Sequence, residues 1–98
     1  MDDSDKTATA EKQVFQLFVS GMSANSMQAI TNINSLFNKY IPKLYELEII
    51  DIYKNPECAL PNQIVFSPSL VRQSPLPKVT LIGTFSDTEK VIKSLGFI

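Results

Sequence analysis

The sequence predicts one mixed α/β domain, because strand and helix patterns alternate along a chain of 98 residues. A β-prone apolar run covers 14–19, an amphipathic helix pattern follows it, and a second strand pattern covers 45–52. The remaining residues, 53–98, predict a short helix, two strands and a last helix. A chain of this size has room for a single core, which buries roughly 60–65% of the surface of the unfolded chain.

The first strand is predicted at 14–19, where Val14, Phe15, Leu17, Phe18 and Val19 form a nearly continuous apolar run. Such a run is typical of a central strand that is covered on both faces. Residues 1–13 have few large apolar side chains and predict a flexible N-terminal arm. The domain is therefore expected at 14–98.

A helix is predicted after the turn at Gly21. Its apolar side chains recur at spacings of three and four, and they are Met27, Ile30, Ile33, Leu36, Phe37, Tyr40 and Ile41. We interpret this stripe as core. Pro42 ends the helix, and Ser23, Asn25 and Ser26 can each cap its start.

The second strand alternates apolar and acidic residues over 45–49 and becomes continuously apolar afterwards, which predicts an edge or near-edge strand. Asn55, Pro56 and Glu57 then form a helix-start signal. Pro61 keeps that helix short.

Two strands, 70–73 and 78–82, are predicted to form a hairpin whose tip is stiffened by Pro75 and Pro77. Ser86 and Glu89 have the spacing of a capping box and predict the start of the last helix. Gly96 is expected to end it.

This order of elements resembles a thioredoxin-like fold. A thioredoxin-type redox enzyme has two cysteines at the first helix start, where this chain has Ser23-Ala24-Asn25-Ser26. The sequence has one cysteine, Cys58, and no histidine, which excludes an intrachain disulfide, an imidazole-based triad and a histidine-ligated zinc site. We expect no catalytic residue, cofactor or metal. The resemblance also implies a cis peptide bond at Ser67-Pro68.

Charge and hydropathy indicate which classes of partner are not expected. The chain has 9 basic and 10 acidic residues without a basic stripe, so nucleic acid is not an expected partner. No apolar run approaches the roughly 20 residues that span a bilayer, and the N-terminus does not resemble a leader. We therefore expect no membrane association and a cytoplasmic location.

The chain resembles the KaiB family over about 15–95. The segments that carry the resemblance are LFVSGMSANS, LYELEIIDIYKNP, IVFSPSLV, PLP, LIG and SDTEKVI. The resemblance implies a non-enzymatic regulator that binds the ring of a KaiC-type ATPase. It also implies two alternative folds, one thioredoxin-like and one tetrameric. The proline-rich second half, whose short apolar groups suit helix or strand, is consistent with such a switch.

Partner-binding residues are transferred from the family by position. The residues implied are Gln28, Asn34, Tyr45, Glu46, Glu48, Lys54 and Arg72. Gln28 and Glu48 depart from basic residues of the family, as do Val79 and Thr80 after the proline-rich turn. The alternative interpretation of the charged residues is an ordinary solvated surface.

The function predicted from the sequence is KaiC-type ATPase regulation through the thioredoxin-like state. Two alternatives stay open: a thioredoxin-like redox or stress protein that uses Cys58, and an interaction adaptor that no longer binds KaiC. Aromatic content and the family resemblance together predict a homo-oligomer, either a tetramer or a dimer.

Overall fold

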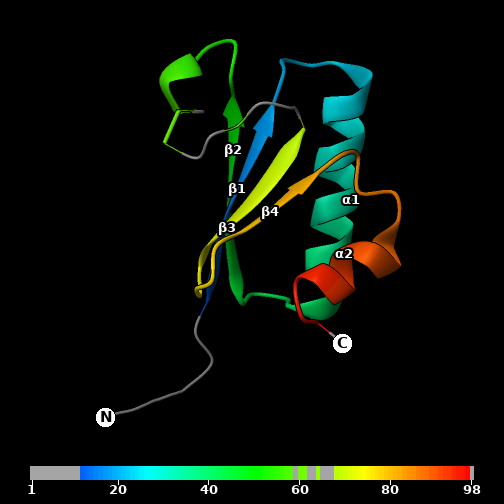
Figure 1. Ribbon diagram of the computed structural model, residues 1–98. Coiled ribbons are helices and arrows are strands. Elements are labelled where there is room, and N and C mark those ends of the chain that lie inside the picture. The colour runs from blue at the N-terminus through cyan, green and yellow to red at the C-terminus, as the bar shows by residue number, and fades with distance from the viewer. Residues whose placement is uncertain (1–11, 59, 62–63, 65–67, 98) are drawn as a thin grey trace.

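The computed structural model describes residues 12–58, 60–61, 64 and 68–97. Its centre is one four-stranded sheet with the strand order β2-β1-β3-β4 (Figure 1). The strands are β1 (Gln13–Val19), β2 (Tyr45–Asp51), β3 (Ser69–Ser74) and β4 (Val79–Ile82). β1 is parallel to β2 and antiparallel to β3, and β3 is antiparallel to β4. The predicted order of elements and the thioredoxin-like fold class are confirmed.

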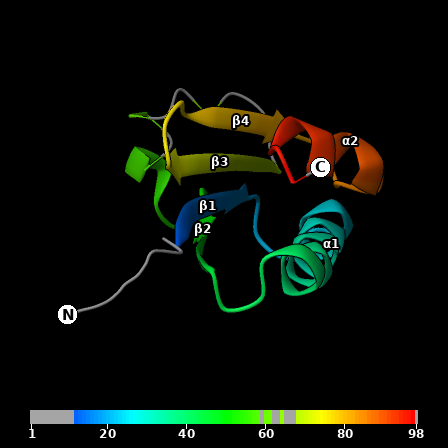
Figure 2. The ribbon, with the colours of Figure 1, turned by 90° about the horizontal axis from the view of Figure 1, so that it is seen from below.

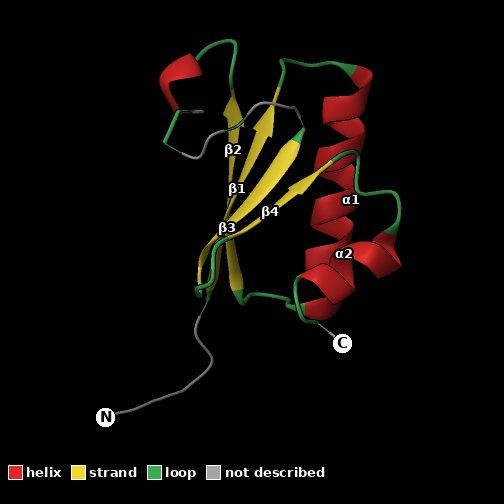
Figure 3. Cartoon of the chain, viewed as in Figure 1, coloured by secondary structure: helices red, strands yellow, loops and turns green. Residues whose placement is uncertain are grey.

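Both α-helices lie on the same face of the sheet. Figures 2 and 3 show α1 (Ala24–Tyr40) and α2 (Thr88–Ser94) side by side on that face. We call this the helix face and its opposite the open face. The open face carries a smaller apolar cluster at one end, where the 3₁₀ helix η1 (Pro56–Cys58) follows β2.

β1 is the central strand that its apolar run predicts. Phe15 and Leu17 are fully buried on the helix face, where they pack with Ile33 and Phe37 of α1. Phe18 is fully buried in the cluster on the open face. Burial on both faces explains why the strand is apolar at almost every position. β1 begins at Gln13, and residues 1–11 of the predicted arm lie outside the described residues.

α1 begins at Ser23, whose hydroxyl accepts a hydrogen bond from the Ser26 amide. The structure therefore selects Ser23 among the three candidate caps. The helix ends at Tyr40, before Pro42, as predicted. The interpretation of Met27 as core is wrong, because its side chain is 42% exposed at the margin of the stripe.

The β3–β4 hairpin and the short helix η1 are found where the sequence predicts them. The Ser74-Pro75 and Leu76-Pro77 bonds at the hairpin tip are cis. The predicted cis bond at Ser67-Pro68 lies outside the described residues, because Ser67 is among those that are not described.

The predicted capping box at α2 is wrong in its first residue. Asp87 is the N-cap, and its Oδ1 accepts a hydrogen bond from the Lys90 amide at 3.2 Å. The Ser86 hydroxyl instead pairs with the Thr84 hydroxyl at 2.8 Å. Both residues have oxygen-bearing side chains, so the sequence pattern fits a helix start one residue earlier equally well.

Candidate functional site

β2 is an edge strand with an unpaired backbone side. The Ile52 amide donates to the Val19 carbonyl at 2.9 Å, and the Gln13 amide donates to the Leu44 carbonyl at 2.9 Å. Because backbone groups alternate between the two sides of a strand, residues 46, 48 and 50 bond to β1. Tyr45, Leu47 and Ile49 therefore direct their amides and carbonyls away from the sheet.

Tyr45 extends from β2 over the helix face. Its hydroxyl donates to Asn38 Oδ1 of α1 at 3.0 Å, and its ring meets the Phe37 ring edge-on with centroids 5.0 Å apart. The half-buried Tyr45 therefore fixes the β2 edge against α1, and only part of its side chain is accessible to a partner.

Glu46 and Glu48 point to the open face, opposite to Tyr45. The carboxylate of Glu48 accepts from Gln16 Nε2 at 3.0 Å, and Gln16 Oε1 accepts from Gln73 Nε2 at 2.7 Å. These three side chains form a polar row across β2, β1 and β3. Glu48 is therefore exposed but positioned by its neighbours.

The two predicted partner residues of α1 lie on different sides of that helix. Gln28 is exposed and Asn34 is half-buried. Six residues at about 100° each separate their directions by about 120° around the helix axis. Asn34 lies on the same side as Asn38, toward β2, whereas Gln28 points away from the sheet.

Lys54 and Arg72 lie apart from the open part of the β2 edge. Lys54 is exposed in the turn that follows β2. Arg72 is half-buried, and its guanidinium donates to the Leu95 carbonyl at 3.1 Å and to the Pro77 carbonyl at 3.4 Å. The seven predicted residues thus do not form one patch. On the helix face Tyr45 contacts Asn38, which lies one helical turn from Asn34, whereas Glu46 and Glu48 lie together on the open face.

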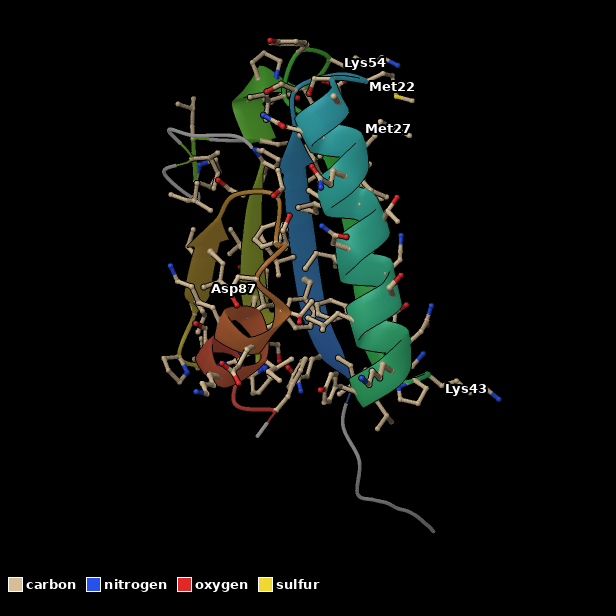
Figure 4. The ribbon with its side chains drawn as sticks, turned by 90° about the vertical axis from the view of Figure 1, so that its right-hand side faces the viewer. Met22, Met27, Lys43, Lys54 and Asp87 are labelled. Carbon is tan, nitrogen blue, oxygen red and sulfur yellow. The ribbon has the colours of Figure 1, made fainter. Side chains whose placement is uncertain are left out.

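A group of exposed apolar side chains at the carboxyl end of β1 and β2 is absent from the prediction. It consists of Met22, Met27, Ile49 and Tyr53, which are 79%, 42%, 44% and 75% exposed, and we call it the strand-end patch. Figure 4 shows Met22 and Met27 at the same end of the molecule as Lys54, with Lys43 at the other end. The apolar spacing of the helix predicts Met27 as a core residue. The sequence pattern therefore does not indicate an exposed patch at this end of the helix.

The Asp51 carboxylate bonds to both turns of the strand-end patch, the turn after β1 and the turn after β2. Its Oδ1 accepts from the Gly21 amide at 3.1 Å and from the Tyr53 amide at 2.9 Å. Gly21 has a φ of 61°, and a Cβ there would lie 3.4 Å from the Tyr53 ring. The ring of Tyr53 therefore rests against the turn before α1, and a preformed surface needs little ordering when a partner binds.

The place of the thiols in a redox enzyme is occupied by two hydrogen-bonded serines. The Ser23 hydroxyl donates to the Ser26 hydroxyl at 2.9 Å, and Ser26 Oγ also accepts from the Ser20 amide at 3.0 Å. Ser26 is completely buried. Cys58 lies elsewhere, half-buried beside the cluster on the open face. These serines stabilise the turn and the helix start. Their hydroxyl groups cannot form the disulfide of a thioredoxin-type enzyme.

The described residues contain neither a cluster of metal ligands nor a membrane-spanning helix. Within 12–58, 60–61, 64 and 68–97, no three histidine, cysteine or acidic side chains gather as metal ligands. No helix in those ranges has the length and apolar character to cross a bilayer.

Sequence comparison with known proteins shows the family of this chain. The KaiB domain model matches residues 16–97. The chain is 36% identical over 85 residues to circadian clock protein KaiB3 of a Synechocystis strain, covering 87% of this chain and 83% of that protein. It is 34% identical to circadian clock oscillator protein KaiB of a Cyanothece strain, covering 87% and 81%. The chain belongs to the KaiB family.

Solved structures support the fold of this KaiB family member. The N-terminal domain of Synechococcus elongatus SasA superposes with a TM-score of 0.74 at 20% identity, covering 94% of this chain and 90% of that one. The Drosophila thioredoxin Deadhead gives 0.69 at 17% identity, covering 88% and 80%. At these identities the likeness concerns the fold, which both proteins share with this chain.

Proposed function

We propose that the chain is a KaiB-type clock regulator that has no catalytic activity of its own and acts by binding the ring of a KaiC-type ATPase. The observation that carries the proposal is the KaiB match, which runs through nearly all described elements. The paired serines in place of redox thiols support a binding role over a redox role.

The β2 edge and the strand-end patch are the surfaces that suit a partner best. An extended segment that pairs with β2 would meet three residues with outward backbone groups, which gives affinity through main-chain hydrogen bonds. Beside it, Met22, Ile49 and Tyr53 offer exposed apolar area. Tyrosine is enriched among the residues that dominate binding energy, and methionine is common on adaptable binding surfaces. Tyr45, Glu46 and Glu48 then contribute orientation and selectivity.

The thioredoxin-like arrangement is the state that we propose for the bound form. Parallel β1 and β2 with η1 after them create the edge and the patch together. A partner that binds only this arrangement shifts any equilibrium with a second fold toward it, provided that the two folds differ by no more than a few kcal/mol.

The proposal is tested with the purified chain and the KaiC-type ATPase of the same host, mixed with ATP or ADP and separated by size. We expect the chain to comigrate with the ring. Met22→Ala and Ile49→Pro should weaken the complex, whereas Leu76→Ala should not. Leu76 is a matched control, because it is as exposed as Met22, at 79%, but lies at the hairpin tip.

Two outcomes would contradict the proposal. Absence of any complex under both nucleotides would favour the adaptor alternative, which the departures at Gln28 and Glu48 already motivate. Equal loss of binding for Met22→Ala and Leu76→Ala would remove the strand-end patch from the interface.

A further inference from the structure

A cavity of about 460 Å³ lies on the helix face between β4 and α2. Figure 2 shows β4 along one rim of the sheet, with α2 on the helix face at the level of β4 and β3. The apolar part of the cavity is formed by Leu81 of β4, Phe85 of the following loop and Val91 of α2. Ligand sites in proteins commonly have volumes of roughly 300–1,000 Å³. The cavity therefore has room for a large apolar group.

The backbone of β4 is unpaired on its outer side. The Gly83 amide donates to the Pro68 carbonyl at 3.0 Å, which fixes the residues of β4 that bond to β3. In an antiparallel ladder alternate residues bond to the same neighbour. Leu81 therefore bonds toward β3, and Thr80 and Ile82 direct their amides and carbonyls away from the sheet.

These outward backbone groups border the cavity. Thr80 and Ile82 are among the residues that line it. Thr80 pairs with Val71, which lies in the open-face cluster, so the side chains of Thr80 and Ile82 point to the open face. Their backbone groups are therefore the parts that meet the cavity on the helix face. A groove between an edge strand and a helix suits an extended peptide that adds a strand to the sheet.

Antiparallel pairing fixes which side chain of such a peptide enters the cavity. The peptide residues opposite Thr80 and Ile82 exchange two hydrogen bonds with each of them. The residue between these two lies opposite Leu81, and opposite residues direct their side chains to the same face of a sheet. Its side chain therefore points into the cavity. The peptide residue opposite Ile82 covers a side chain that is 60% exposed.

Lys90 gives the groove a preference for negative charge. It is exposed and lines the cavity from α2, and among the described residues its ammonium has no ion-pair partner. Asp87 also lines the cavity, but its Oδ1 accepts from the Lys90 amide and caps α2. The space over Gly83 is open, because a Cβ there would meet nothing within 4 Å. A peptide residue opposite Gly83 shares the face of the residue opposite Leu81, so an acidic side chain there has room to extend toward Lys90.

We propose that the groove between β4 and α2 binds an extended segment of a partner protein in which an acidic residue stands two positions before a large apolar residue. A second copy of β4 fits less well, because with Leu81 facing Leu81 its Lys78 would lie opposite Thr84 and bring another cation to the cavity that Lys90 lines. The β4 edge is separated from the β2 edge by two strands. The inference therefore does not rest on the proposed binding of a KaiC-type ring.

The groove is tested by NMR titration of the full chain with a synthetic peptide, Ser-Thr-Glu-Val-Leu-Thr-Ser, capped at both ends. Its leucine is placed opposite Leu81 and its glutamate opposite Gly83. Because β4 has only four residues, binding should be weak, and the titration extends to about 1 mM peptide. We expect the amide resonances of Thr80, Ile82 and Val91 to shift. No shift at any concentration, or shifts confined to the strand-end patch, would overturn the inference.

Methylation of single peptide amides tests the strand pairing and its register. N-methylation of the valine removes a donor to Ile82 and should raise the dissociation constant at least about threefold. N-methylation of the leucine blocks an amide that faces away from β4 and should have little effect. Thr80→Pro in the chain removes an outward amide without removing a bond to β3 and should weaken binding in the same way as the first methylation. Equal effects of the two methylations would contradict pairing with β4.

A charge exchange tests the preference for an acidic residue. Lys90→Glu should weaken binding of the peptide about fivefold at low salt and should favour a second peptide in which lysine replaces the glutamate. Lys43→Glu is the matched control, because it makes the same charge change in the turn between α1 and β2. An unchanged order of the two peptides for Lys90→Glu would overturn the charge assignment. Ile49→Pro should weaken the complex with the KaiC-type ring but not that with the peptide, so failure of either proposal is recognised separately.

Discussion

At the scale of single residues, the start of α2 depends on Asp87 rather than Ser86. We predict that Asp87→Ala lowers the free energy of unfolding by about 1 kcal/mol, because the Lys90 amide loses its acceptor. Asp87→Asn, which keeps the oxygen, should cost only part of that. Ser86→Ala is the control, since Ser86 is exposed and bonds to Thr84. Denaturant unfolding of the three variants checks the order, and a larger loss for Ser86→Ala would contradict it.

Cys58 provides a second prediction at this scale. Its half-buried side chain packs beside Phe18 and Ile50, so Cys58→Ser should destabilise the fold by roughly 1 kcal/mol by placing a hydroxyl among apolar groups. Binding to the ring should not change. Reduction of an insulin disulfide by the unaltered protein, abolished in Cys58→Ser, would instead support the redox alternative.

At the scale of elements, a strand was predictable from the sequence where the covering of its faces alone determines which of its residues are apolar. β1 is apolar at nearly every position because both of its faces are covered. β2 alternates over 45–48 because Tyr45 and Leu47 pack on the helix face while Glu46 and Glu48 lie on the open face. Met27 was not predictable in the same way. A stripe fixes a direction around a helix but not the width of the surface that covers it, and Met27 lies at the margin of the stripe, beside the completely buried Ser26.

Arg72 shows how one side chain joins two elements, and it provides the prediction at this scale. Its guanidinium bonds to the carbonyl of Leu95, the C-cap of α2, and to the Pro77 carbonyl at the hairpin. Arg72→Ala should lower the free energy of unfolding by about 1–3 kcal/mol, because a charged donor at a helix C-terminus is lost. Arg72→Lys should be intermediate, since an ammonium lacks the planar fork.

The measurement for Arg72 is denaturant unfolding together with amide hydrogen exchange in α2. Loss of protection confined to α2 and the hairpin is the expected pattern. An unchanged stability would mean that Arg72 acts at the surface alone, as the family resemblance by itself implies. A contact between Arg72 and a partner remains a separate prediction.

At the scale of the whole molecule, the fold was more predictable than the site. The order of elements along the chain follows from local patterns that agree with each other, and the fold class follows from the resemblance. The site depends on which faces and edges are left uncovered, and this emerges only when the elements pack. Tyr45 and Glu46 are adjacent in the sequence yet lie on opposite faces, whereas Met22 and Tyr53 are distant in the sequence and flank the same turn. When partner-binding residues are transferred from a family one position at a time, the transfer does not show which of them lie on the same surface.

The last prediction concerns the equilibrium between two folds. If the KaiC-type ring selects the thioredoxin-like state and the free chain is divided between two states, Asp87→Ala should reduce the population that can bind. A change of about 1 kcal/mol corresponds to about a fivefold change in that equilibrium. We therefore expect up to about fivefold weaker apparent affinity and slower complex formation, with an unchanged dissociation rate. Ser86→Ala should behave like the unaltered chain.

Backbone NMR of the free variants, combined with binding kinetics on the ring, makes this measurable. The thioredoxin-like state is recognised by contacts between β1 and its parallel neighbour β2 and by the antiparallel β3–β4 ladder. A second set of resonances should grow in Asp87→Ala in proportion to the loss of affinity. Destabilisation without a second set of resonances and without slower binding would mean that the chain keeps one fold, because a ligand cannot shift an equilibrium whose second state is not populated or accessible.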